Sequence, residues 1–162
     1  DGAGQTEENQ VDCLSAAAAV VNNEEEGYWT LNSGFCMPKT HTSIQRLSAK
    51  LASDKALAEA FRSAVQVGVH WDTEVAGDSK HRVCQVLCSA MPVGVVKTVR
   101  TSEWQGPAEL VLSAAYDATL TAAAILARQR GERVKVFLTL VGGGALGNRR
   151  HWIADALNLV LG

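Results

Sequence analysis

The sequence lacks a concentrated basic region. Its 15 lysines and arginines are balanced by 17 acidic residues, and the formal net charge is -2. The densest charge runs are the acidic residues 24–26 and the basic pair Arg149-Arg150. Because proteins that bind nucleic acid through its phosphates normally carry a basic stripe, the sequence argues against bulk nucleic-acid binding.

Long apolar runs and a metal-binding cysteine pattern are also missing. No uninterrupted apolar stretch approaches the ~18–20 residues of a membrane-spanning helix, so no membrane span is predicted. The four cysteines, Cys13, Cys36, Cys84 and Cys88, form no Cys-x-x-Cys pair, which argues against zinc. Cys84 and Cys88 fall in a predicted strand and lie ~13 Å apart there, too far for a disulfide. We therefore expect reduced thiols, no bound metal and a reducing soluble compartment, cytoplasmic or organellar.

What the sequence does contain is typical of one globular domain. The 162 residues, 47% apolar and 20% charged, suffice for a single core, so residues 1–162 are expected to form one domain without a cofactor. Residues 9–21, 42–65 (with a break at Ser53-Asp54), 108–130 and 151–161 have helical patterns, with Pro107 expected near the start of the third. Residues 28–31, 65–69, 83–87 and 134–141 have the patterns of strands.

The order of these elements predicts an α/β fold. Helix and strand alternate in the second half, which indicates a three-layer domain with a mixed, mostly parallel central sheet and helices on both faces. Residues 134–141 are apolar except for Lys135 and Thr139. A run of this kind predicts an interior strand that is covered on both faces.

A glycine-rich loop follows this strand and precedes the last helix. It reads Gly142, Gly143, Gly144, Ala145, Leu146, Gly147 and Asn148. Three consecutive glycines cost conformational entropy, so they indicate a positive φ or a close approach to the backbone. Backbone N–H groups, the following helix N-terminus and Arg149-Arg150 favour an anion such as a phosphate or diphosphate. The alternative is a tight turn without a ligand, because the spacing matches neither a dinucleotide fingerprint nor a P-loop.

The segment 134–148 and its helix resemble the strand, phosphate-binding loop and closing helix of macro domains, which bind ADP-ribose. Gly144-Ala145-Leu146-Gly147 is similar to the Gly-x-x-Gly turn of that family, and residues 83–92 are similar to its preceding strand and loop. The resemblance covers about the C-terminal half, so the macro-domain-like fold that it implies is incomplete at the N-terminus. It implies binding of ADP-ribose or a related phosphorylated nucleotide, with or without weak hydrolysis. The implied ligand-binding residues are Gly142, Gly143, Gly144, Ala145, Leu146, Gly147, Asn148 and, from the preceding loop, Ser89.

A competing hypothesis is a non-catalytic structural or assembly subunit that keeps the fold without a working pocket. The Asn-rich strand end typical of macro domains has no equivalent here, and catalytic residues are not identified. His70, Asp72 and Glu74 follow a predicted strand and offer a base with carboxylates, although a polar turn is the commoner role. A nucleophilic Cys88 would need a partner base, and His151 could hydrogen-bond a phosphate or lie on the surface.

Tryptophans are the remaining candidates for a binding surface. Trp29, Trp71 and Trp104 lie near the ends of predicted elements. At such positions they could line a pocket or contact a protein partner.

Overall fold

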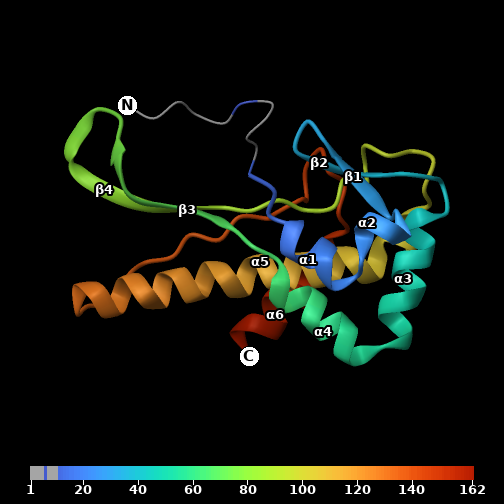
Figure 1. Ribbon diagram of the computed structural model, residues 1–162. Coiled ribbons are helices and arrows are strands. Elements are labelled where there is room, and N and C mark those ends of the chain that lie inside the picture. Colours follow the sequence, from blue (N-terminus) through green and yellow to red (C-terminus); the bar gives the residue numbers. More distant parts are fainter. Residues whose placement is uncertain (1–5, 7–10) are drawn as a thin grey trace.

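A computed structural model describes Thr6 and residues 11–162 (Figure 1). Its helices are α1 (Ser15–Val20), α2 (Asn23–Glu26), α3 (Ser43–Ser53), α4 (Lys55–Ala64), α5 (Thr101–Arg130) and α6 (Arg150–Leu161). Its strands are β1 (Trp29–Asn32), β2 (Phe35–Pro38), β3 (Gly68–Val75) and β4 (Asp78–Leu87). The helix α5 runs through the molecule, and the other elements are arranged around it (Figure 1).

The core surrounds the N-terminal half of α5. Trp104 and Leu112 of α5 are fully buried, as are Ile44 of α3, Phe61 of α4 and Ile153 of α6. Helices α3, α4 and α6 pack against α5 because each presents apolar residues along one face. The C-terminal half of α5 extends beyond this core, beneath the β3–β4 hairpin (Figure 1).

Helix α5 begins earlier than the sequence pattern predicted. Pro107 lies inside the helix, not at its start, and the helix begins at Thr101. The carboxylate of Glu103 accepts a hydrogen bond from the amide of Arg100 at 3.0 Å, which stabilises the helix start. α5 is long and apolar enough to cross a membrane, judged by length and mean hydropathy alone. The core helix of a soluble protein also meets these two criteria.

Each sheet is an antiparallel hairpin closed by a tight turn. β1 pairs with β2, and β3 pairs with β4. Ser33 and Gly34 both have positive φ, 50° and 78°, the backbone geometry of the turn type that best joins two twisted strands. Gly77, with φ of 83°, lies in the turn between β3 and β4.

The predicted mixed, mostly parallel sheet with helices on both faces is therefore wrong. In the described chain the sheets are two-stranded and antiparallel, and residues 134–141 are not a strand. Phe137 and Leu140 are 84% and 59% exposed, so this segment is not an interior strand either. The physical reason is local pairing: each strand of the hairpins bonds to its neighbour in sequence, and none pairs with residues 134–141.

Several local predictions are confirmed. Helices α3 and α4 are separated at Asp54, whose carboxylate accepts a hydrogen bond from the amide of Leu57 at 2.9 Å, as an N-cap does. Helix α6 occupies nearly the predicted range. Helix α1 begins at Ser15, later than the predicted start at Asn9, which lies outside the described residues.

One tyrosine fixes the end of the extended segment 134–141. The buried Tyr116 of α5 donates a hydrogen bond from its hydroxyl to the carbonyl of Thr139 at 2.7 Å and accepts one from the amide of Val141 at 3.1 Å. Burial raises the pKa of this hydroxyl, so it keeps its proton at neutral pH. Tyr116 thus positions the chain immediately before the glycine loop.

Tyr116→Phe is expected to lower the free energy of unfolding by ~1 kcal/mol, because the carbonyl of Thr139 and the amide of Val141 each lose one of two partners and keep only the 3.0 Å bond between them. Urea unfolding measures this loss, and hydrogen exchange should quicken at Val141. Tyr28→Phe, at a buried tyrosine outside this contact, is the control and should leave exchange at Val141 unchanged. Equal exchange at Val141 in Tyr116→Phe and the unmodified protein would contradict the anchoring role.

Candidate ligand-binding site

A cavity of about 600 Å³ lies where the end of β4 meets the glycine loop. Its size falls within the ~300–1,000 Å³ range of small-molecule sites. Ser89, Gly142 and Leu146, three of the residues predicted to bind a ligand, line it together. The structure therefore brings the loop and the segment after β4 to one concavity.

Two glycines of the loop are required by the backbone. Gly142 and Gly147 have positive φ, 72° and 68°, a region that other residues rarely adopt. A Cβ at Gly142 would lie 2.5 Å from the Cβ of Ala90, and a Cβ at Gly147 would lie 2.7 Å from the Cα of Gly94. Gly142 and Gly147 therefore allow the loop to pack against the segment that follows β4.

Gly143 and Gly144 are different, because the positive φ that three consecutive glycines indicate is absent there. A Cβ at Gly143 would lie 3.1 Å from Cδ1 of Ile153 and 3.2 Å from the carbonyl oxygen of Leu140, whereas a Cβ at Gly144 would meet no atom within 4 Å. Gly143, Gly144 and Ala145 are exposed. Gly144 can therefore be replaced by a residue with a side chain without disturbing the fold.

Asn148 has a structural position behind the loop. Its side chain is 4% exposed and does not line the cavity. Its Nδ2 donates a hydrogen bond to the carbonyl of Met91 at 2.8 Å, while the amide of Gly94 donates to the carbonyl of Leu146 at 2.7 Å. These two bonds join the loop to residues 91–94.

The loop uses only part of its backbone donors. Internal hydrogen bonds of 2.9–3.0 Å run from the amide of Gly143 to the carbonyl of Leu140, from Gly147 to Gly144 and from Asn148 to Gly142. Within the described chain, the amides of residues 144–146 donate to no group. These three donors thus have no partner in the described chain, although of their residues only Leu146 lines the cavity. Gly143, Gly144, Ala145 and Gly147, four of the residues predicted to bind a ligand, do not line it.

The start of α6 adds positive potential beside the loop. The N-cap residue Arg149 provides no side-chain hydrogen bond to the first turn, so the amides there remain available. Arg149 and Arg150 are exposed, and no ion pair involves either within the described residues. This end of the helix favours an anion.

The cysteines near the cavity are unsuited to nucleophilic chemistry. All four cysteines are free, as predicted for Cys84 and Cys88. Cys13 and Cys88 line the cavity, and burial raises the pKa of both thiols. Since the thiolate is the nucleophile, neither is activated at neutral pH.

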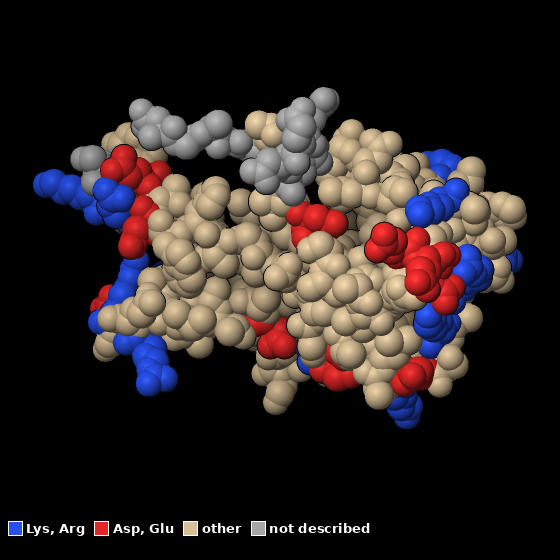
Figure 2. All heavy atoms as spheres, in the orientation of Figure 1, with Lys and Arg blue, Asp and Glu red and all other residues tan. Residues whose placement is uncertain are grey.

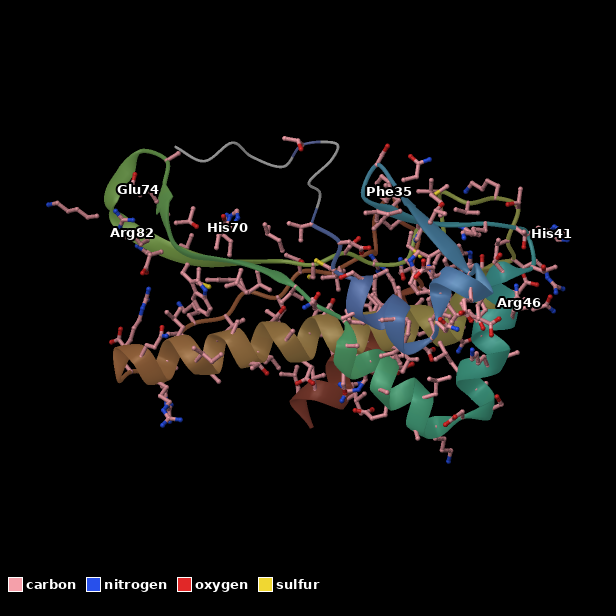
Figure 3. The ribbon with its side chains drawn as sticks, viewed as in Figure 1. Phe35, His41, Arg46, His70, Glu74 and Arg82 are labelled. Atoms are coloured by element: carbon pink, nitrogen blue, oxygen red, sulfur yellow. The ribbon has the colours of Figure 1, made fainter. Side chains whose placement is uncertain are left out.

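The predicted acid–base cluster is divided among ion pairs. It lies within β3, with a bulge at Asp72, whose φ is 52°, and not in a turn. Asp72 pairs with Arg130 at 3.4 Å, and Glu74 pairs with Arg82 at 2.7 Å. His70 borders the cavity on a different part of the hairpin from Glu74 and Arg82 (Figure 3), and neither carboxylate of the predicted cluster forms a hydrogen bond with it.

The other candidates divide between surface and core. His151 is exposed in the first turn of α6. Trp29 and Trp104 are buried, whereas Trp71 is 45% exposed, so of the three tryptophans Trp71 alone is accessible to a partner. Across Thr6 and residues 11–162, no group of histidines, cysteines and carboxylates could hold a metal ion.

Sequence reasoning missed two residues that position this site. Gly94 contacts the backbone of Gly147, and Tyr116 holds the chain before the loop. Gly94 follows Pro92-Val93, and this turn-like sequence was the only local indication of its position. Tyr116 lies in an apolar helix, and nothing in its sequence context indicates its partners.

Comparisons with protein families, with curated proteins and with solved structures find no match for this chain. The macro-domain resemblance therefore rests on the motif alone and remains a prediction.

Proposed function

We propose that the cavity beside residues 142–148 binds a phosphorylated nucleotide such as ADP-ribose. The observation that carries the proposal is the row of amides at residues 144–146, which have no partner within the described chain. Leu146 lines the 600 Å³ cavity, and the exposed residues Gly144 and Ala145 precede it in the same loop. Consecutive backbone N–H groups of a loop can bind phosphate oxygens.

The charge around the loop supports an anionic ligand. Arg149 and Arg150 stand at the positive end of α6, next to the loop in sequence. Helix dipole and arginine charge act in the same direction, and a diphosphate gains from both.

The remaining wall suits the nucleoside part of such a ligand. Leu146 and Val86 provide apolar surface for a base or ribose. Ser89 is exposed, and its hydroxyl donates only to the carbonyl of Ala90, at 3.4 Å. That long bond leaves Ser89 able to hydrogen-bond a ligand hydroxyl.

Binding without catalysis is the function that this arrangement supports. The two thiols of the cavity are protonated at neutral pH because burial raises their pKa. The nearby carboxylates of Asp72 and Glu74 are paired with arginines. Hydrolysis would require a general base that a second residue holds in the right orientation.

Calorimetry with ADP-ribose tests the proposal. Gly144→Val should weaken binding at least about tenfold, because a branched side chain shields the amides at Gly144 and Ala145. Leu146→Ala should weaken it only about threefold, through lost apolar contact. Ala124→Val, at an exposed position on α5, is the matched control and should bind as the unmodified protein does.

Thermal unfolding of the same variants separates binding from folding. Gly144→Val should unfold at the temperature of the unmodified protein, because a side chain at Gly144 has open space. If the unmodified protein binds neither ADP-ribose nor other phosphorylated nucleotides, the proposal fails and the assembly-subunit alternative is the better account.

A further inference from the structure

The extended segment at residues 134–140 leaves most of its backbone groups without a hydrogen bond in the described chain. Within the described residues, none of its amides donates a hydrogen bond, and the carbonyls of residues 134–138 accept none. Val134 and Leu138 are half-buried, and the other residues of the segment, Phe137 among them, are exposed. Backbone of this kind is a strand edge that lacks a neighbour.

A groove separates this segment from β4. It encloses about 670 Å³ between Val83 and Val86 of β4 and Val136 and Leu138 of the segment. The C-terminal half of α5 forms its floor through residues that include Ala123 and Leu126. In Figure 1 the segment runs beneath the β3–β4 hairpin and along α5. The groove is therefore apolar at its base and bounded by backbone on both sides.

The second side of the groove is also an unpaired edge. β4 pairs with β3 alone among the described strands, so along residues 83–87 its other edge presents N–H and C=O groups that have no partner in the described chain. A strand placed in the groove could thus form ladders with β4 and with residues 134–140 at once. At ~3.3 Å per residue, about seven residues of extended chain match the length of the segment.

The charges around the groove define the chemistry of such a strand. Arg82, Arg130, Arg133 and Lys135 line it, against Glu132. Arg82 and Arg130 are neutralised by carboxylates of β3, whereas Arg133 and Lys135 have no ion pair within the described chain. Figure 2 shows Lys and Arg side chains gathered at the end of the molecule where the hairpin and the end of α5 lie.

We propose that this groove accepts an extended acidic segment of a partner protein, which adds as a strand between β4 and residues 134–140. Apolar side chains at alternate positions of the partner would face Ala123 and Leu126, and acidic side chains would pair with Arg133 and Lys135. A second copy of the chain fits less well, because its own extended segment carries the same two cations. This function is separate from nucleotide binding at the glycine loop.

Selection from a random heptapeptide library on the full chain tests the proposal. Selected peptides should alternate β-branched or aromatic residues with acidic ones. On addition of a selected peptide, hydrogen exchange should slow at residues 134–140 and in β4, because new ladders protect those amides. Replacing the acidic residues of the peptide with lysine should weaken binding at least about tenfold.

Proline variants separate strand pairing from side-chain contact. Neighbouring amides of an extended chain point to opposite edges, so of Val136→Pro and Phe137→Pro one removes a donor that faces β4. That variant should bind the peptide at least about tenfold more weakly, while the alanine variant at the same position, Val136→Ala or Phe137→Ala, retains the amide and serves as its control. Circular dichroism should show both proline variants folded, because neither amide has a partner in the described part of the chain.

Three results would overturn the proposal: no enrichment of acidic β-prone peptides, equal binding to both proline variants, or protection of residues 134–140 by self-association in the absence of peptide. None of these bears on calorimetry with ADP-ribose, so failure here and failure of the nucleotide site are distinguishable.

Discussion

Gly147→Val lowers the free energy of unfolding by about 3 kcal/mol or more, because it combines left-handed strain with backbone overlap. The added Cβ would lie 2.7 Å from the Cα and 2.8 Å from the nitrogen of Gly94. Both atoms belong to backbone, which cannot swing aside as a flexible side chain can. The loop must move away from Gly94, and the 2.7 Å hydrogen bond from the amide of Gly94 to the carbonyl of Leu146 breaks.

Gly144→Val is the matched control for this loss. It places the same side chain in the same loop, where φ is not positive and no atom lies within 4 Å of the added Cβ. Its free energy of unfolding should stay within about 0.5 kcal/mol of the unmodified protein. Urea titration measures both variants, and equal losses at Gly147 and Gly144 would contradict the seating of the loop on Gly94.

Asn148→Asp is expected to cost about 3 kcal/mol at neutral pH, since it buries a charge without a partner. The side chain is 4% exposed, and Nδ2 donates to the carbonyl of Met91 at 2.8 Å. A carboxylate oxygen at that place faces the same carbonyl as a second acceptor. The change keeps the shape of the residue, so the loss is electrostatic and not a matter of packing.

The pH dependence of Asn148→Asp identifies this cause. Burial raises the pKa of a carboxyl group in the folded state above its unfolded value. The folded variant then binds more protons than the unfolded variant, so its stability falls as pH rises. The deficit relative to the unmodified protein should therefore shrink from about pH 7 to about pH 5.

Asn158→Asp, an exposed position on α6, makes the same chemical change at the surface. It should show neither the loss nor its pH dependence. A deficit in Asn148→Asp that does not vary with pH would contradict the buried position of this side chain.

The sequence predicts local structure well wherever neighbouring residues determine it. Asp54 separates α3 from α4 because its side chain caps the following helix. Ser33 and Gly34 close the first hairpin because both adopt positive φ. Both signals act within a few residues, and the break at Asp54 lies where the sequence predicts it.

Long-range pairing could not be predicted in this way. The apolar run at residues 134–141 indicates burial, yet composition says nothing about whether a strand lies alongside. Here β4 pairs with β3, and Phe137 stays 84% exposed. The parallel sheet was inferred from the order of the elements, and that inference failed at this segment.

The residues predicted to bind a ligand are only partly brought together. Ser89, Gly142 and Leu146 border one cavity, whereas Gly143, Gly144, Ala145, Gly147 and Asn148 do not line it. The run of three glycines does not reveal which of them has positive φ, since that depends on Ala90 and Gly94 from another segment. Asn148 likewise lies behind the loop, where it donates to Met91.

The most direct test of the account is a titration of the isotope-labelled chain with ADP-ribose, followed by backbone amide NMR. The account predicts that the largest shifts fall on the amides of residues 144–146, with smaller shifts at Ser89, and that inorganic pyrophosphate moves the same loop amides. Saturating ADP-ribose that leaves residues 144–146 unmoved would contradict binding at this loop.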